Sequence, residues 1–174
     1  MPHLNVEIKA LCENQNAIRE ILLARQADFR GTDHQIDTYF NVNSGRLKLR
    51  EGNIENYLIH YERENIEGPK QSHVTLFASD PSSTLKEILL KSLGILTVVD
   101  KQREIYFIEN VKFHLDTVLG LGTFVEIEAI DKTGDIGKDR LLEQCAYYLE
   151  LFAIPTANLL ADSYSDLLLR GTRE

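Results

Sequence analysis

Several segments of this sequence alternate apolar and charged residues with a period of two, and this pattern constrains the fold more than any other feature. Arg46, Lys48 and Arg50 share one face of their segment, while Leu47 and Leu49 share the opposite face. Successive side chains of a β-strand point to opposite sides of the sheet, so such a segment is typical of a strand with one charged face. Similar patterns predict strands over 4–12, 35–41, 45–51, 56–64, 73–78, 98–108, 111–118 and 124–131.

Apolar residues at helical spacing predict four helices, over 14–25, 85–93, 137–152 and 157–169. Short turn sequences separate the strands over 35–64, which makes these strands antiparallel neighbours. The sequence contains no internal repeat and no linker. We therefore expect residues 1–174 to form a single α+β domain, in which antiparallel strands form a curved sheet or barrel with helices outside.

The overall charge narrows the range of partners. The chain has 19 Lys and Arg against 27 Asp and Glu, a formal net charge of −8 at pH 7, which disfavours general binding to nucleic acid or to an anionic membrane. No run is long enough to span a membrane, and the N-terminus does not resemble a signal peptide. We expect a cytoplasmic protein with neither nucleic acid nor membrane as partner, whose Cys12 and Cys145 are small core residues.

The charged strand faces divide into basic and acidic ones. Lys101 and Arg103 repeat the basic pattern of residues 46–50, whereas Glu126 and Glu128 share an acidic face. One interpretation is that these faces simply contact solvent. The other is that the sheet closes into a tunnel, in which Arg and Lys bind phosphates and carboxylates hold Mg²⁺. Composition does not decide between the two.

Six short motifs follow one another along the chain: Asn5-Val-Glu7-Ile-Lys9, Leu49-Arg50-Glu51, Lys101-Gln-Arg103, a strand that contains Asp116, Gly120-Leu-Gly122, and Glu126-Ile-Glu128. Their ordered combination resembles the CYTH domain, which class IV adenylyl cyclases share with thiamine triphosphatases within the triphosphate tunnel metalloenzymes. The resemblance covers residues 4 to about 168, and the stretch 101–126 is most similar to the class IV cyclases.

The resemblance implies an eight-stranded antiparallel β-barrel that forms a tunnel, with helices packed outside. It also implies that seven basic residues bind the triphosphate: Lys9, Arg46, Lys48, Arg50, Arg63, Lys101 and Arg103. Among these, Lys9, Arg50, Lys101 and Arg103 are the expected catalytic cations. The implied ligands of Mg²⁺ or Mn²⁺ are Glu7, Asp116, Glu126 and Glu128. The candidates for contacts to a base or ribose are His60, Tyr61, Lys70 and His114, for which packing or solvent roles are equally good interpretations.

The function that this resemblance implies is a Mg²⁺-dependent, class IV-type adenylyl cyclase that converts ATP to cyclic AMP and pyrophosphate. Hydrolysis of an inorganic or thiamine-linked triphosphate is an alternative in the same tunnel, and a homodimer is a further family-based expectation. Asn5 occupies the position where the family usually has its first Glu. An amide oxygen can coordinate a hard cation, but it carries no charge and cannot act as a base. A non-catalytic module that binds a nucleotide or polyphosphate is therefore a third hypothesis.

Overall fold

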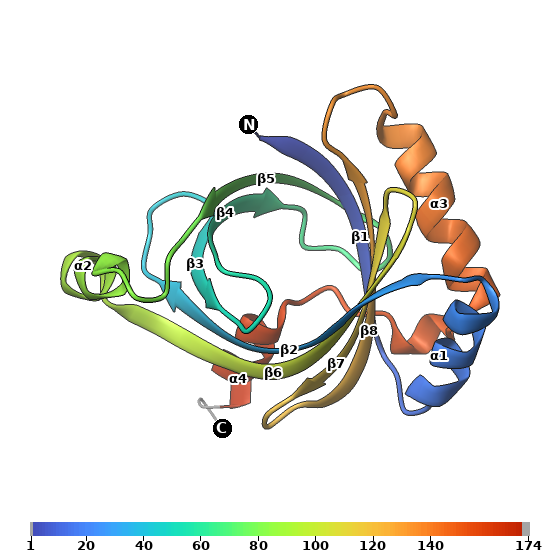
Figure 1. The fold of residues 1–174 in the computed structure, drawn as a ribbon, viewed down its shortest axis with the longest axis horizontal. Coiled ribbons are helices and arrows are strands. Elements are labelled where there is room, and N and C mark those ends of the chain that lie inside the picture. The colour runs from blue at the N-terminus through green and yellow to red at the C-terminus, as the bar shows by residue number, and fades with distance from the viewer. Residues whose placement is uncertain (1, 172–174) are drawn as a thin grey trace.

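A computed structural model describes residues 2–171 of the chain (Figure 1). Its strands are β1 (His3–Leu11), β2 (Asp28–Phe40), β3 (Arg46–Glu51), β4 (Tyr57–Arg63), β5 (Lys70–Ala78), β6 (Ile95–Ile108), β7 (Val111–Val118) and β8 (Gly122–Asp131). The helices in this part of the chain are α1 (Gln15–Ala24), α2 (Leu85–Leu93), α3 (Lys138–Leu151), the short 3₁₀ helix η1 (Thr156–Asn158) and α4 (Tyr164–Gly171). Met1 and the last three residues of the predicted domain lie outside the described residues.

The eight strands form a closed barrel in the order β1-β5-β4-β3-β2-β6-β7-β8, and β8 pairs again with β1. All of these pairs are antiparallel. Closure gives each strand two hydrogen-bonded neighbours and avoids the exposed backbone of an open sheet edge. The predicted barrel with external helices is thus confirmed.

The outward face of β1, β7 and β8 carries the main hydrophobic core. Val6 and Ile8 of β1 and Phe113 of β7 are at most 1% exposed and pack in one cluster with Leu22 of α1 and Leu141 of α3. In Figure 1, α1 and α3 lie together against this side of the barrel. The apolar half of the alternation therefore faces the helices, which leaves the charged half to face the interior.

A second, smaller apolar cluster lies at one end of the barrel interior. The ring of Tyr164, at the start of α4, lies 4.9 Å from the ring of Phe124 on β8, centroid to centroid. Both side chains are buried, together with Tyr39, Tyr61 and Val118. The C-terminal segment thus closes this end of the barrel.

The helix predicted over 157–169 is wrong, because two short helices and an extended segment occupy this region. The backbone N–H of Leu160 donates to the carbonyl oxygen of Lys9 at 2.9 Å, so the chain pairs with β1 between η1 and α4. Ser163 directly precedes α4, and its hydroxyl oxygen accepts a hydrogen bond from the N–H of Asp166, in the first turn of that helix, at 3.2 Å. This capping contact lets a new helix begin after the break.

Strand β2 is longer than predicted, beginning at Asp28 rather than at residue 35. Charged residues interrupt the apolar alternation in 28–34, but pairing with β6 keeps the segment extended across a bulge between Phe29 and Gly31. None of the described helices is long and apolar enough to cross a membrane.

Replacing Phe113 by Ala should lower the free energy of unfolding by about 3–5 kcal/mol, because it removes a fully buried ring from the core between barrel and helices. The ring makes edge contacts with Tyr148 and Phe152, at centroid distances of 4.7 and 5.6 Å. Urea denaturation measures the loss. Phe77→Ala is the control, because Phe77 is 63% exposed and its loss should cost at most about 0.5 kcal/mol. Equal losses in the two variants would contradict this packing.

Candidate functional site

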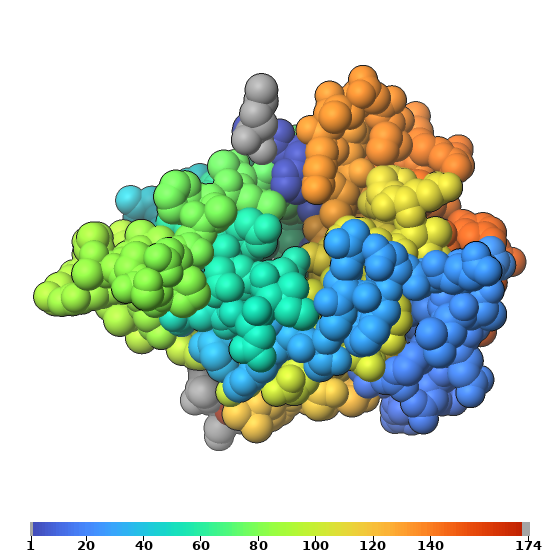
Figure 2. Space-filling model, viewed as in Figure 1, coloured from blue at the N-terminus to red at the C-terminus, as the bar shows by residue number. Residues whose placement is uncertain are grey.

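A cavity of about 260 Å³ lies inside the barrel, and its walls are the inward-facing side chains of the strands. Asn5, Glu7 and Lys9 of β1 contribute to it because they alternate with the outward-facing Val6 and Ile8. In the view of Figure 2, the molecular surface is hollowed between the first strand (dark blue) and the teal segment around β4.

Six of the seven predicted triphosphate ligands line this cavity: Lys9, Lys48, Arg50, Arg63, Lys101 and Arg103. They come from β1, β3, β4 and β6, and closure of the barrel brings them together. The seventh, Arg46, lies outside this lining. Its guanidinium donates to the Ser163 hydroxyl at 2.6 Å and to the Asp166 carboxylate at 2.9 Å, so it holds the C-terminal segment at the closed end.

Asp37 on β2 binds three of the six basic side chains that line the cavity. It was not predicted as a site residue from the sequence. Its carboxylate is fully buried and accepts two hydrogen bonds from Arg50, both at 2.9 Å, and one each from Lys101 at 2.8 Å and Lys48 at 3.0 Å. Burial alone would raise the pKa of Asp37, but Arg50, Lys101 and Lys48 hold it well below its usual range. The period-two face formed by Gln35, Asp37 and Tyr39 was the available signal.

Asp116 on β7 plays the corresponding part for Arg103. Its buried carboxylate accepts from the Nε of Arg103 at 2.8 Å and from its Nη2 at 2.7 Å, and the Tyr164 hydroxyl donates to it at 2.7 Å. This bidentate pair fixes the plane of the guanidinium. Asp116 was predicted as a metal ligand or ligand support, and the structure places its carboxylate against Arg103.

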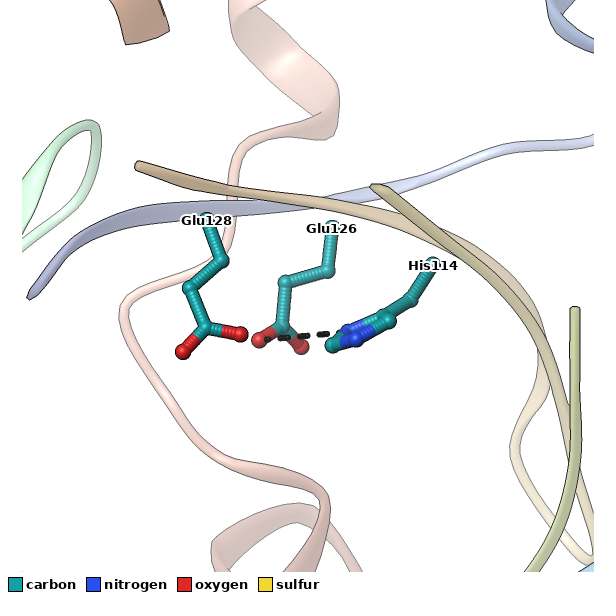
Figure 3. A group of neighbouring side chains, drawn as sticks. All are labelled: His114, Glu126 and Glu128. Atoms are coloured by element: carbon teal, nitrogen blue, oxygen red, sulfur yellow. Dashed lines mark ion pairs between the residues drawn. The ribbon is translucent and has the colours of Figure 1, made fainter. Parts of the chain in front are cut away.

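His114, Glu126 and Glu128 form a compact group that could hold a cation (Figure 3). One ligand atom from each lies within 4.8 Å of the others, and Figure 3 shows all three side chains converging from β7 and β8. Of the four predicted metal ligands, the structure brings Glu126 and Glu128 into this group. Glu7 lies opposite Glu128 across the β1–β8 ladder, but its carboxylate accepts from Arg63 at 3.0 Å.

The oxygen atoms that these side chains offer as metal ligands fit a divalent cation such as Mg²⁺ or Mn²⁺. Among the described residues, the Asn5 amide oxygen and both ring nitrogens of His114 are buried without a hydrogen-bond partner, while the Asn5 amide nitrogen donates to Glu128. Burial and the nearby Arg103 lower the pKa of His114 to about 4, so its ring is neutral at pH 7, the form that binds metals. Two carboxylates and an amide oxygen are ligands that suit Mg²⁺ or Mn²⁺, and the neutral imidazole of His114 lies beside them.

The pKa values of the two carboxylates in this group are shifted in opposite directions. Burial opposes ionisation of Glu126, yet the charges of Lys9, whose Nζ lies 3.6 Å away, and of Arg103 hold its pKa well below the usual range. Burial raises the pKa of Glu128 to about 7, and the neighbouring Glu126 and Glu7 add to this while Lys112 opposes it. A bound cation would relieve the repulsion between these carboxylates.

The four residues considered for base or ribose contacts have different surroundings. Tyr61 lines the cavity, and His114 belongs to the carboxylate group. Lys70 is fully buried and donates to the Leu160 carbonyl oxygen at 2.6 Å. The Nε2 atom of His60 lies 3.0 Å from the Ser44 carbonyl oxygen, in an exposed contact.

The fold and its basic tunnel agree with the comparison to known families, in which the model of the CYTH domain matches residues 3–164. The chain belongs to the CYTH domain family. It is 28% identical to a Methanocaldococcus jannaschii protein named "Putative adenylate cyclase", a match that covers 94% of this chain and 98% of that protein. The match therefore spans nearly the full length of both chains.

Solved structures share the fold of this CYTH domain at lower sequence identity. The PH1012 protein of Pyrococcus horikoshii is 22% identical with a TM-score of 0.72, over 94% of this chain and 98% of that one. A Hippeastrum protein described as a "putative adenylyl cyclase" with a dominant triphosphatase activity is 14% identical with a TM-score of 0.61, over 99% of this chain and 96% of that one. These likenesses establish the tunnel fold.

Replacing Asp37 by Asn should destabilise this CYTH domain by about 3–5 kcal/mol, because the buried Arg50 and Lys101 and the partly buried Lys48 lose the carboxylate that they share. Urea denaturation without phosphate measures the effect, and added tripolyphosphate should restore part of the lost stability. Asp28→Asn is the control, because Asp28 pairs with Arg30 through a side chain that is 58% exposed, and its loss should cost at most about 0.5 kcal/mol. If Asp37→Asn were as stable as this control, Asp37 would not be holding Arg50, Lys101 and Lys48 in position.

Proposed function

We propose that this CYTH domain is a divalent-cation-dependent enzyme that acts on ATP as an adenylyl cyclase and releases cyclic AMP and pyrophosphate. The observation that carries the proposal is the cavity inside the barrel, in which Lys and Arg side chains converge beside Glu126 and Glu128. A polyphosphate chain needs several cations along its length, and a divalent cation binds carboxylate and phosphate oxygens together.

The basic residues are held in position for binding. Asp37 orients Arg50 and Lys101, and Asp116 orients Arg103 through two hydrogen bonds. Arg63 is a further candidate for binding phosphate, because its buried Nε and Nη2 atoms lack a hydrogen-bond partner among the described residues. Phosphate oxygens would satisfy these donors, and preorganised donors spend little free energy on reorientation.

Glu126, Glu128 and Asn5 would hold Mg²⁺ or Mn²⁺ beside the phosphates, with the ring of His114 next to them. The cation would supply charge neutralisation at the phosphoryl group and help to fix its orientation. Asn5 contributes an oxygen without charge, so Glu126 and Glu128 provide the negative charge of this ligand set.

In the proposed reaction, the ribose 3′-hydroxyl oxygen attacks the α-phosphorus, the bond from that phosphorus to the bridging oxygen breaks, and pyrophosphate leaves. The hydroxyl proton is released to solvent or to a nearby acceptor. Arg50, Lys101 and Arg103 stabilise the charge that develops on the leaving pyrophosphate. The cavity walls would hold the ribose against the triphosphate, and this proximity favours cyclisation.

Hydrolysis of a triphosphate is the second candidate. The same cations and carboxylates suit attack by water on the terminal phosphorus, and the triphosphatase activity described for the Hippeastrum protein of similar fold supports this alternative. A non-catalytic binding module is the third candidate, because Asn5 replaces a charged ligand.

Product analysis separates the three candidates. We expect purified protein with ATP and Mg²⁺ or Mn²⁺ to form cyclic AMP and pyrophosphate in equal amounts. Orthophosphate released from tripolyphosphate or thiamine triphosphate, without cyclic AMP from ATP, would instead establish the hydrolase. If calorimetry showed tight binding of triphosphates and no product formed, the chain would be a binding module.

Glu126→Gln should reduce turnover at least about 100-fold and weaken binding of Mn²⁺, because it removes a charged ligand from the carboxylate group. Calorimetric titration with Mn²⁺ alone provides a readout that does not depend on activity. Glu104→Gln is a matched control, because Glu104 lies on β6, which β7 separates from β8, and forms a salt bridge with Arg19 at 2.7 Å. Unchanged turnover and Mn²⁺ affinity in Glu126→Gln would remove Glu126 from the metal site.

A further inference from the structure

The loop 52–56, which joins β3 and β4, is held in place by a buried carboxylate. Asp33 on β2 is fully buried, and its oxygens accept hydrogen bonds from the backbone N–H groups of Asn53 at 2.6 Å, Ile54 at 2.9 Å and Glu55 at 3.0 Å. Three consecutive N–H groups directed at one carboxylate define the turn of the backbone. In Figure 1 this loop (teal) folds toward the barrel axis.

Further contacts restrict the same loop. The Asn56 side chain accepts from the N–H of Gly52 at 3.0 Å and donates to its carbonyl oxygen at 2.9 Å. Gln35 Nε2 donates to Asp33 at 2.9 Å and to Glu55 at 3.0 Å. A Cβ atom at Gly52 would lie 2.7 Å from both Asp33 oxygens, so the loop passes too close for a larger residue. Several side chains thus hold Glu55 in one position.

The result of this arrangement is a carboxylate inside the basic cavity. Glu55 lines the cavity, accepts a hydrogen bond from Lys112 of β7 on the far wall, and lies 3.5 Å from the Nη1 atom of Arg50. Burial opposes its ionisation, but Lys112 and Arg50 keep the pKa of Glu55 far below its usual range. Glu55 is therefore a fixed negative charge among residues that would otherwise attract phosphate.

The neighbourhood of Glu55 differs from the rest of the cavity. Along the strand ladders Phe107 pairs with Lys112, and Lys112 pairs with Glu128, so this region lies on the side of the carboxylate group away from Asp116 and the closed end. Phe107, Tyr57, Leu76 and Ile130 line the cavity here. Aromatic and aliphatic surfaces beside one hydrogen-bond acceptor suit an organic group better than a phosphate.

We propose that Glu55 determines ligand specificity, selecting triphosphates that carry a neutral, hydrogen-bond-donating organic group over inorganic tripolyphosphate. This inference rests on the proposed function, because it takes the ligand to be a triphosphate held by the cations of the tunnel. The carboxylate accepts a hydrogen bond from a hydroxyl or amino group and repels any phosphate that enters its end of the cavity. Repulsion of the wrong ligand contributes to specificity as much as attraction of the right one.

The test compares dissociation constants for ATP and for tripolyphosphate, measured by calorimetry with Mg²⁺, in the unchanged protein and in Glu55→Gln. We expect tripolyphosphate to bind Glu55→Gln about tenfold more tightly, because Lys112 and Arg50 lose their negative partner. ATP should gain much less or should bind more weakly, since a charged acceptor is lost. The ratio of the two constants should therefore change about tenfold.

Glu51→Gln is the matched control, because Glu51 pairs with Lys86 at 2.7 Å away from the tunnel, and it should leave the ratio unchanged. Phe107→Leu provides a second test that keeps the loop intact, and it should weaken ATP binding several-fold without changing tripolyphosphate binding.

The outcomes separate this inference from the proposed function. If the unchanged protein binds both ligands but Glu55→Gln and Phe107→Leu leave the ratio within twofold, the specificity role is overturned and the function stands. If the unchanged protein binds neither ligand, both the specificity role of Glu55 and the proposed function are overturned.

Discussion

Closing a sheet of alternating strands into a barrel forces one face of every strand into an enclosed interior, and in this chain that face is charged. Removing an ion from water costs several kcal/mol, so the interior is stable only if its charges compensate one another. Asp37 does this for Arg50, Lys101 and Lys48, and Asp116 does it for Arg103. The external hydrophobic core depends on the same closure, because the residues that pack on α1 and α3 alternate with the charged ones.

Some buried polar atoms in the barrel interior find no partner within the described part of the protein, and these atoms indicate a binding site. Among the described residues, Arg63 has two buried donor atoms, His114 two ring nitrogens and Asn5 an amide oxygen without hydrogen-bond partners. Buried polar groups rarely stay unsatisfied in native proteins. The donor atoms of Arg63 suit an anion, whereas the oxygen of Asn5, which contacts Glu128, suits a cation. The interior is therefore complementary to a metal-bound polyphosphate.

The two ends of the cavity are chemically different, which gives a bound ligand a direction. Tyr164 and Phe124 close one end with a packed aromatic pair, and Arg46 ties the C-terminal segment to β3. The other end presents the carboxylate of Glu55 with the ring of Phe107. Cations from several strands lie between these ends. An elongated ligand with one highly charged part and one neutral part matches this arrangement better than a symmetrical anion.

The sequence by itself predicted most of the strand positions and placed Arg50, Lys101 and Glu126 on the charged faces of their strands, because a period of two assigns each side chain to a face. The expectation that these faces line a tunnel came from the resemblance to the CYTH domain. It did not reveal Asp37 as the partner of three cations, the position of Arg46 against α4, or the entry of Glu55 into the tunnel. A period of two states which face a residue occupies, but not which residue lies across the barrel from it. Strand order and closure decided those neighbours, because they bring β2, β3, β6 and β7 around one interior.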